Sequence, residues 1–134
     1  MKYLLDTSVW LRAVHEPDSI PAAHRRLLNS SSETFGLSAI SLWEVAKKVQ
    51  VGKLPLDKPL RVWFETYLTA NMVLLPLDED VMTDVLTLQD FPNRDPADEI
   101  IVATARVYGL TLLTTNRLLR GYSHAKVNYF KPRQ

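Results

Sequence analysis

Four acidic residues lie where strand-like runs give way to helical segments, or where a helical segment begins. Asp6 follows the apolar run KYLL, and Glu44 lies within LSAISLWEVAKKV. Asp95 and Asp98 open the segment NRDPADEIIVATA. In an open parallel sheet the carboxyl ends of all strands face one crevice, and ligands bind there. We therefore expect these carboxylates to meet in space although they are distant in the sequence.

Such a cluster is suited to binding a divalent metal ion. Carboxylates without Cys or His among them favour a hard cation held by oxygen, such as Mg²⁺ or Mn²⁺. A cation held in this way can assist the hydrolysis of a phosphodiester. Asp6, Glu44 and Asp98 are the expected ligands and catalytic residues. Asp95 is a further candidate ligand, and Asn116, which closes the run LTLLTT, could join weakly through a water molecule.

Each acid also has a structural interpretation as part of a helix start. Asp6 could cap the helix that follows it, although Ser8 could cap that helix instead. Ser41 and Glu44 form the pattern S-x-x-E of a capping box, in which the Glu side chain reaches back to the Ser amide. The two roles of Glu44 exclude each other only if its carboxylate cannot turn toward the crevice.

Asp95 and Asp98 fit a helix start equally well. Pro96 suits the first helical position, Asp95 suits the cap, and an acid at Asp98 is favoured by the helix dipole. This interpretation does not explain why acids from three separate segments should fall at the same end of one sheet. We therefore keep the metal site as the main hypothesis.

Hydroxyl and basic side chains near these acids are candidates for contact with a substrate. The hydroxyl candidates are Thr7, Ser8 and Thr115, which capping and strand propensity explain as well. The chain beyond Glu99, its last acid, is cationic and could bind a polyanion. Such a stretch is also an ordinary solvated surface. The basic candidates for backbone contact are Arg94, Arg117 and Arg120.

Composition describes a single globular domain spanning residues 1–134. Hydrophobic residues make up 46% of the chain and charged residues 23%, and the net charge is only +1. No apolar run approaches the roughly 20 residues of a membrane helix. Cysteine is absent, which excludes disulfides and thiolate zinc sites and fits the reducing cytoplasm.

Strand-like and helix-like segments alternate along the chain. The expected strands are 2–6, 34–39, 73–77, 110–115 and 127–130. The expected helices are 7–14, 21–29, 41–51, 59–70, 78–88 and 96–108. This alternation predicts an α/β fold, a three-layer α/β/α sandwich with a central parallel sheet of about five strands.

The segments LLDTSVWL, LSAISLWEVAKKVQVGKL and RDPADEIIVATARVYGLTLLTTN together span most of the chain. In combination they resemble the PIN-domain ribonucleases, and more narrowly the VapC-type toxins of type II toxin–antitoxin systems. The resemblance implies a PIN-like fold in which Asp6, Glu44 and Asp98 bind Mg²⁺ or Mn²⁺. Two positions depart from the family pattern. Asn116 stands where a further acid is usual, and Glu99 stands where a basic residue is common.

The resemblance implies a metal-dependent endoribonuclease that acts as a toxin in the cytoplasm. It also implies a homodimer and a cognate antitoxin whose C-terminal segment occludes the site. The alternative is a PIN-like RNA-binding module that has lost productive metal binding. A phosphatase on a similar sheet is disfavoured, because such enzymes place D-x-D after the first strand and here Asp6 is followed by Thr7 and Ser8.

Overall fold

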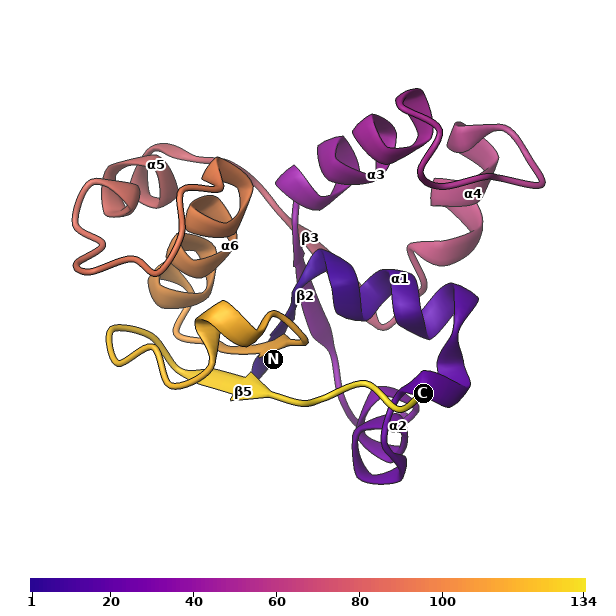
Figure 1. Cartoon of the computed structure of the whole chain (residues 1–134), viewed down its shortest axis with the longest axis horizontal. Helices are drawn as coiled ribbons and strands as arrows, with labels where there is room; N and C mark the ends of the chain where they lie inside the picture. Colours follow the sequence, from indigo (N-terminus) through magenta and orange to yellow (C-terminus); the bar gives the residue numbers. More distant parts are fainter.

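The computed structural model describes all residues, 1–134, and has a five-stranded sheet between two layers of helices (Figure 1). All neighbouring strands are parallel, in the order β3-β2-β1-β4-β5. The strands are β1 (Tyr3–Leu5), β2 (Phe35–Ser38), β3 (Met72–Leu75), β4 (Thr111–Thr114) and β5 (Val127–Tyr129). The predicted parallel sheet is confirmed, with each strand slightly shorter than expected.

Six α-helices cover the two faces of the sheet. One face carries α1 (Thr7–His15), α2 (Ala22–Leu28), α3 (Ile40–Gln50) and α4 (Leu60–Tyr67), and the other carries α5 (Glu79–Val85) and α6 (Pro96–Val107) (Figure 1). All six were expected. Two short 3₁₀ helices, η1 (Pro17–Ser19) and η2 (Arg117–Leu119), were not expected. No helix is both long enough and apolar enough to span a bilayer.

The central strand β1 shows why the protein has two cores. Leu4 and Leu5 are both buried, and successive side chains of a strand point to opposite faces. Leu5 belongs to a cluster of ten buried residues beneath α1–α4, which includes Trp63. Leu4 belongs to a cluster of eight against α6, which includes Ile101. A strand buried on both faces reads as an uninterrupted apolar run, which is the pattern of Tyr3–Leu5.

The strand order reverses direction at β1, and this reversal places the candidate site. The chain moves outward from β1 to β2 and β3, then returns to β4 on the other side of β1. The carboxyl ends of β1 and β4 therefore flank a topological switch point. Asp6 follows β1, and Asn116 closely follows β4. Because α6 runs back across the sheet to reach β4, its first turn, with Asp98, lies at this same edge.

Glycines lie just beyond the last residues of α3 and α6. Gly52 and Gly109 have φ of +78° and +66°, the left-handed conformation that a glycine adopts without steric cost. After Gly52 the amide of Lys53 donates to the carbonyl of Lys48 at 2.9 Å, which closes a Schellman turn. This turn fixes the direction in which the chain leaves α3, beside the candidate site.

Candidate active site

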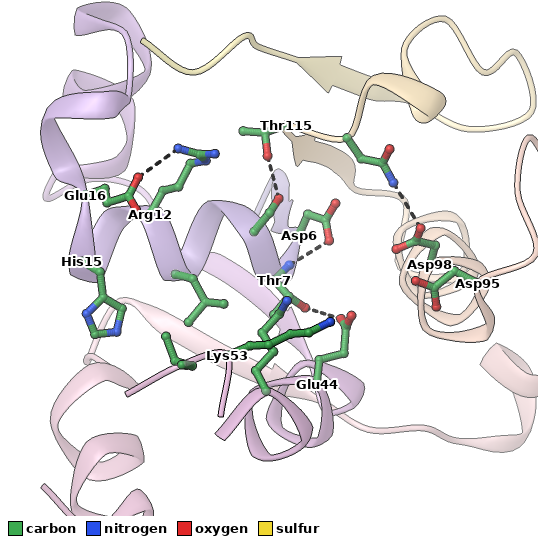
Figure 2. Close-up of a pocket in the computed structure, with 15 residues that line it drawn as sticks. Asp6, Thr7, Arg12, His15, Glu16, Glu44, Lys53, Asp95, Asp98 and Thr115 are labelled. Carbon is green, nitrogen blue, oxygen red and sulfur yellow. Dashed lines mark hydrogen bonds and ion pairs between the residues drawn. The ribbon is translucent and has the colours of Figure 1, made fainter. Parts of the chain in front are cut away.

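A polar pocket of about 460 Å³ opens at the carboxyl edge of the sheet (Figure 2). Its walls include all four predicted acids, which are Asp6, Glu44, Asp95 and Asp98. Leu11 and Leu54 are the only apolar residues that line it. The structure therefore brings the acids of three separate segments to one cavity. We call this cavity the acid pocket.

Asp6 both caps α1 and faces the acid pocket. Its carboxylate is 4% exposed, and one oxygen accepts a hydrogen bond from the Thr7 amide at 2.8 Å. The other oxygen accepts from the Thr114 hydroxyl at 2.5 Å, which joins the ends of β1 and β4. The capping interpretation is therefore correct for Asp6, and it does not remove Asp6 from the pocket.

Glu44 does not form the capping box that the sequence allows. Helix α3 begins at Ile40, so Ser41 lies inside the helix and no side chain caps it. Glu44 instead accepts from the Thr7 hydroxyl at 2.5 Å. The Ser41 hydroxyl lies 2.7 Å from the same oxygen of Thr7. Because Thr7 has one hydroxyl proton, which goes to Glu44, Ser41 must be the donor to Thr7.

The two acids of α6 have different roles. Asp95 accepts from the Ala97 amide at 3.0 Å and is the N-cap, as the structural interpretation predicts. Asp98 caps nothing. Its Oδ2 accepts from the side-chain amides of Asn93 at 3.0 Å and Asn116 at 3.1 Å. Two neutral donors thus hold one oxygen of Asp98 at the edge of the pocket.

Asn116 lines the acid pocket, and both ends of its side-chain amide make hydrogen bonds. That oxygen accepts from the Leu118 amide at 3.0 Å and starts η2. The amide nitrogen points to Asp98. The expectation that Asn116 is a weak ligand stays a prediction, because an amide oxygen has two lone pairs and this backbone hydrogen bond uses only one of them. Asn116 also helps to orient Asp98.

Burial and mutual repulsion oppose the ionisation of these carboxylates. Burial, with smaller contributions from the charges of Asp98 and Glu44, raises the pKa of Asp6 from 3.8 to about 7, although the Thr114 hydrogen bond opposes this. The pKa values of Glu44 and Asp98 are also raised, mainly by burial and then by neighbouring carboxylates. A cation placed among these groups would favour their charged forms.

The donor set fits a hard divalent cation, because Asp6, Glu44 and Asp98 all offer carboxylate oxygens. Asp6 and Glu44 lie opposite Asp98 and Asp95 in the pocket (Figure 2). In this arrangement no three acidic or histidine residues converge closely enough to form a metal site. Each carboxylate is held on its own wall by the hydrogen bonds described above. Asp6, Glu44 and Asp98 are the residues that would hold the ion, and their carboxylates would have to move closer together to do so.

The predicted substrate contacts are only partly brought to the pocket. Thr7, Ser8 and Thr115 line it, and the Thr115 hydroxyl donates to that of Ser8 at 2.8 Å. Thr7 is already committed to Glu44 and Ser41. The three predicted arginines are exposed and do not line the pocket; they are Arg94, Arg117 and Arg120. Arg120 lies over the ring of Tyr129 at 5.5 Å.

Four basic residues of the pocket were missed in the sequence. They are Arg12, His15, Lys48 and Lys53. Helical spacing was the signal that could have found three of them, since residues four apart share a helix face. Lys48 follows Glu44 by four positions, and Arg12 follows Ser8 by four. Lys53 lies beyond the end of α3 and gave no such signal.

Comparison with known proteins agrees with the predicted family and fold. Residues 3–124 match the PIN domain family. The chain is 30% identical over 126 residues to Ribonuclease VapC22 of Mycobacterium tuberculosis (strain H37Rv). The aligned region covers 92% of this chain and 93% of that protein.

Two solved structures share the fold. VapBC2 from Rickettsia felis, bound to a promoter DNA fragment, matches with a TM-score of 0.73 at 19% identity, over 96% of this chain and 98% of that one. DNA-bound VapBC from Salmonella typhimurium matches with a TM-score of 0.71 at 19% identity and the same coverage. With its domain match, its fold and its acid pocket in agreement, this chain belongs to the PIN-domain family, as a VapC-type member.

Proposed function

We propose that this protein is a metal-dependent endoribonuclease and the toxin of a toxin–antitoxin pair. The observation that carries the proposal is the acid pocket, where Asp6, Glu44 and Asp98 from three remote segments line one cavity. The 30% identity to a protein named as a ribonuclease supports RNA as the substrate. The ion we expect is Mg²⁺ or Mn²⁺.

The residues of the pocket have distinct parts in this reaction. Asp6, Glu44 and Asp98 would hold the cation, and Asp95 would add negative charge nearby. When bound, the cation supplies Lewis-acid chemistry, favouring deprotonation of water and offsetting charge on the phosphoryl oxygens. The hydroxyls of Thr7 and Thr114 fix the carboxylates they donate to. The orientation of these carboxylates is therefore set before the substrate binds, which lowers the entropic cost of the reaction.

A catalytically inactive RNA-binding module is the second candidate function. Two observations favour it. No three acids converge on one point, and Asn116, which donates to Asp98, stands at the position where the family usually has a further acid. Such a module would keep the pocket and bind RNA without cutting it.

Cleavage of labelled RNA by purified protein separates the two candidates. The nuclease should cut in Mn²⁺ or Mg²⁺ and stop in EDTA, and Asp98→Asn should abolish cutting. Asp90→Asn is the matched control, because Asp90 lies outside the acid pocket and has a φ of 51° that Asn also tolerates. Calorimetry with Mn²⁺ should show binding that Asp98→Asn weakens. RNA binding without cutting in any divalent ion would favour the second candidate.

A cognate antitoxin is the partner we expect, in the cytoplasm where RNA is available. Structures of similar fold are described as toxin–antitoxin complexes, among them one from Klebsiella pneumoniae. The acid pocket could accept an Arg or Lys side chain of such a partner in place of the metal. Co-expression with the neighbouring reading frame should yield a complex that does not cut RNA. A complex in which the acid pocket stays open to RNA would contradict this arrangement.

A homodimer is the assembly we expect. The edge strand β3 leaves Val73 and Leu74 exposed by 41% and 44%, and Leu77 and Met82 beyond it are also exposed. An apolar edge of this kind is typical of a protein interface. Light scattering on a size-exclusion column should give twice the mass of the 15.3 kDa chain, and Leu74→Glu should reduce it to a monomer.

A further inference from the structure

The acid pocket continues beyond its carboxylates along α1. Ser8, Arg12 and His15 line it, and their spacing puts them on one face of the helix. The nine residues of α1 span about 13 Å, at about 1.5 Å per residue. The pocket therefore has an acidic end beneath Asp6 and an arm that reaches toward the C-terminal end of α1. This arm is longer than a single phosphodiester group requires.

Two lysines enter this arm from α3 and the turn after it. Lys48 lies one helical turn beyond Glu44 on the same face of α3. The Schellman turn at Gly52 then returns the chain so that the Lys53 amide bonds to the Lys48 carbonyl. Figure 2 shows Lys53 on the same wall as Glu44. The backbone thus fixes both lysines side by side at the rim of the pocket.

Neither lysine forms a salt bridge within the protein, although the charge of Lys48 acts on Glu44 and partly opposes the rise of its pKa. No carboxylate lies within 4.0 Å of the ammonium group of Lys48 or Lys53, although the pocket is rich in acids. Arg12 differs, because it pairs with Glu16 at 3.2 Å. Lys47 differs as well, because it donates to Gln50 at 2.6 Å and does not line the pocket. Two exposed cations can therefore bind an anion at the edge of an acidic cavity.

We infer that Lys48 and Lys53 bind phosphate groups of single-stranded RNA that flank the bond to be cut. This inference rests on the proposed function, since it describes how the same pocket holds its substrate. A polyanion approaching Asp6, Glu44 and Asp98 is repelled by them, and cations on the adjoining wall offset that repulsion. A basic groove tracks the backbone of a single strand without reading its sequence.

The single-strand assignment follows from the shape of the site. The lysines and the carboxylates share one concave pocket of about 460 Å³, so a strand bound at the carboxylates can bring a neighbouring phosphate to the lysines. An extended single strand can bend into such a pocket. A duplex presents its phosphates on a convex surface and holds them at a fixed spacing, so it cannot follow the wall from Lys53 to Asp6.

Salt dependence of RNA binding tests the two lysines directly. Binding of a fluorescent single-stranded oligoribonucleotide is measured by anisotropy over a salt series, in an Asp98→Asn background that does not cut. Each phosphate contact contributes about 0.7 to the slope of log K against log salt for single strands. Lys48→Gln and Lys53→Gln should each reduce the slope by about 0.7, and the double variant by about 1.4. Lys48→Arg and Lys53→Arg should keep it.

Lys47→Gln is the matched control, because it removes the same charge from the neighbouring position of α3 outside the pocket. Equal slopes for Lys47→Gln and the two pocket variants would overturn the inference. A blunt duplex of the same sequence is the second test. If it binds as tightly as the single strand and depends equally on Lys48 and Lys53, the inference is also overturned. Melting curves of each variant confirm that it is folded.

Kinetics in the unsubstituted background distinguish the inference from the function on which it rests. Lys48→Gln and Lys53→Gln should raise KM for RNA several-fold with little change in kcat, because a flanking contact is made equally in the ground state and the transition state. A fall in kcat at constant KM would overturn the flanking-contact role. If the lysine variants cleave normally with unchanged KM, only the lysine contacts are ruled out. If the unsubstituted protein neither cleaves nor binds RNA, the proposed function itself is ruled out.

Discussion

Neutral donors determine where each carboxylate of the acid pocket points. The Thr7 hydroxyl donates to Glu44 and receives a hydrogen bond from the buried Ser41, so one side chain links α1 to α3. The Thr114 hydroxyl does the same for Asp6 between β1 and β4. In a poorly hydrated site such groups must be paired, because an unpaired buried donor or acceptor costs about 1–3 kcal/mol. These donors therefore support stability and catalytic geometry together.

Thr7→Val should separate these effects from packing, because valine has the same shape without the hydroxyl. Ser41 loses its acceptor and Glu44 its donor, so we expect the free energy of unfolding to fall by about 1–3 kcal/mol. Cleavage should fall as well, since Glu44 is no longer held. Urea denaturation and RNA cleavage measure the two effects. Thr7→Ser should retain most of both, and a Thr7→Val protein with unchanged activity would show that Glu44 needs no orientation.

Asn116→Asp should make the protein depend on a cation for its stability. The substitution replaces the amide donor to Asp98 with a second carboxylate facing it. Without metal we expect a lower melting temperature than that of Asn116→Ala, because like charges then repel. With Mn²⁺ we expect a larger rise in melting temperature than for the unsubstituted protein, since a ligand stabilises the state that binds it. Equal rises in all three proteins would place Asn116 outside the metal site.

Helix ends, at the scale of elements, bring the chemistry to the sheet edge. Helices α1, α3 and α6 all begin at the acid pocket, because each follows or precedes a parallel strand and must run back across the sheet. Their N-termini carry partial positive charge, which favours acids there. Asp95 caps α6 and lines the pocket, while Asp98 one turn later lines the pocket without capping the helix. The turn after α3 has a similar importance, because it places Lys53.

Gly52→Ala should test that turn. Nothing lies within 4 Å of an added Cβ at this position, so the cost arises only from the φ of +78°. We expect a loss of about 1 kcal/mol in the free energy of unfolding, together with a higher KM for RNA as Lys53 shifts. Gly52→Asn should be milder, because Asn tolerates positive φ. If Gly52→Ala shows the whole expected loss in the free energy of unfolding but an unchanged KM, the turn does not position Lys53.

The charge of the acid pocket links ion binding, pH and stability in the whole molecule. Asp6 has a pKa of about 7 in the folded protein against an ordinary value of 3.8. The native state thus holds this proton more tightly than the unfolded state does. Stability from this group is fully present below about pH 4 and is lost as the pH rises to about 7. The difference corresponds to about 4 kcal/mol.

Melting curves of the metal-free protein should show this linkage. We expect the free energy of unfolding to fall between pH 4 and pH 7, and Asp6→Asn to flatten that fall because Asn does not titrate. Added Mn²⁺ should restore stability at pH 7, where it binds the ionised carboxylates. Parallel pH profiles for the unsubstituted protein and Asp6→Asn would show that Asp6 does not carry the titration.

Local patterns in the sequence were sufficient for the elements and for the acids. The five strands were recognisable as short apolar runs, and the glycines at positions 52 and 109 marked helix ends because only glycine adopts those φ values freely. The convergence of Asp6, Glu44 and Asp98 on one pocket followed from parallel topology. The capping box at Ser41 was wrong, because α3 begins at Ile40 and the hydroxyl of Thr7, a residue remote in the sequence, takes the carboxylate of Glu44.

The sequence by itself determined the fold class, the family and the residues whose chemistry matters, since these depend on periodicity, turn residues and a motif set. Only the tertiary structure decided what each side chain touches. Asn116 donates a hydrogen bond to Asp98, and no three acids meet at one point. The basic side chains at the pocket include Lys48 and Lys53, and not the predicted Arg117 and Arg120. Such contacts join segments far apart in the chain, and their geometry depends on helix register and strand order, which no local pattern contains.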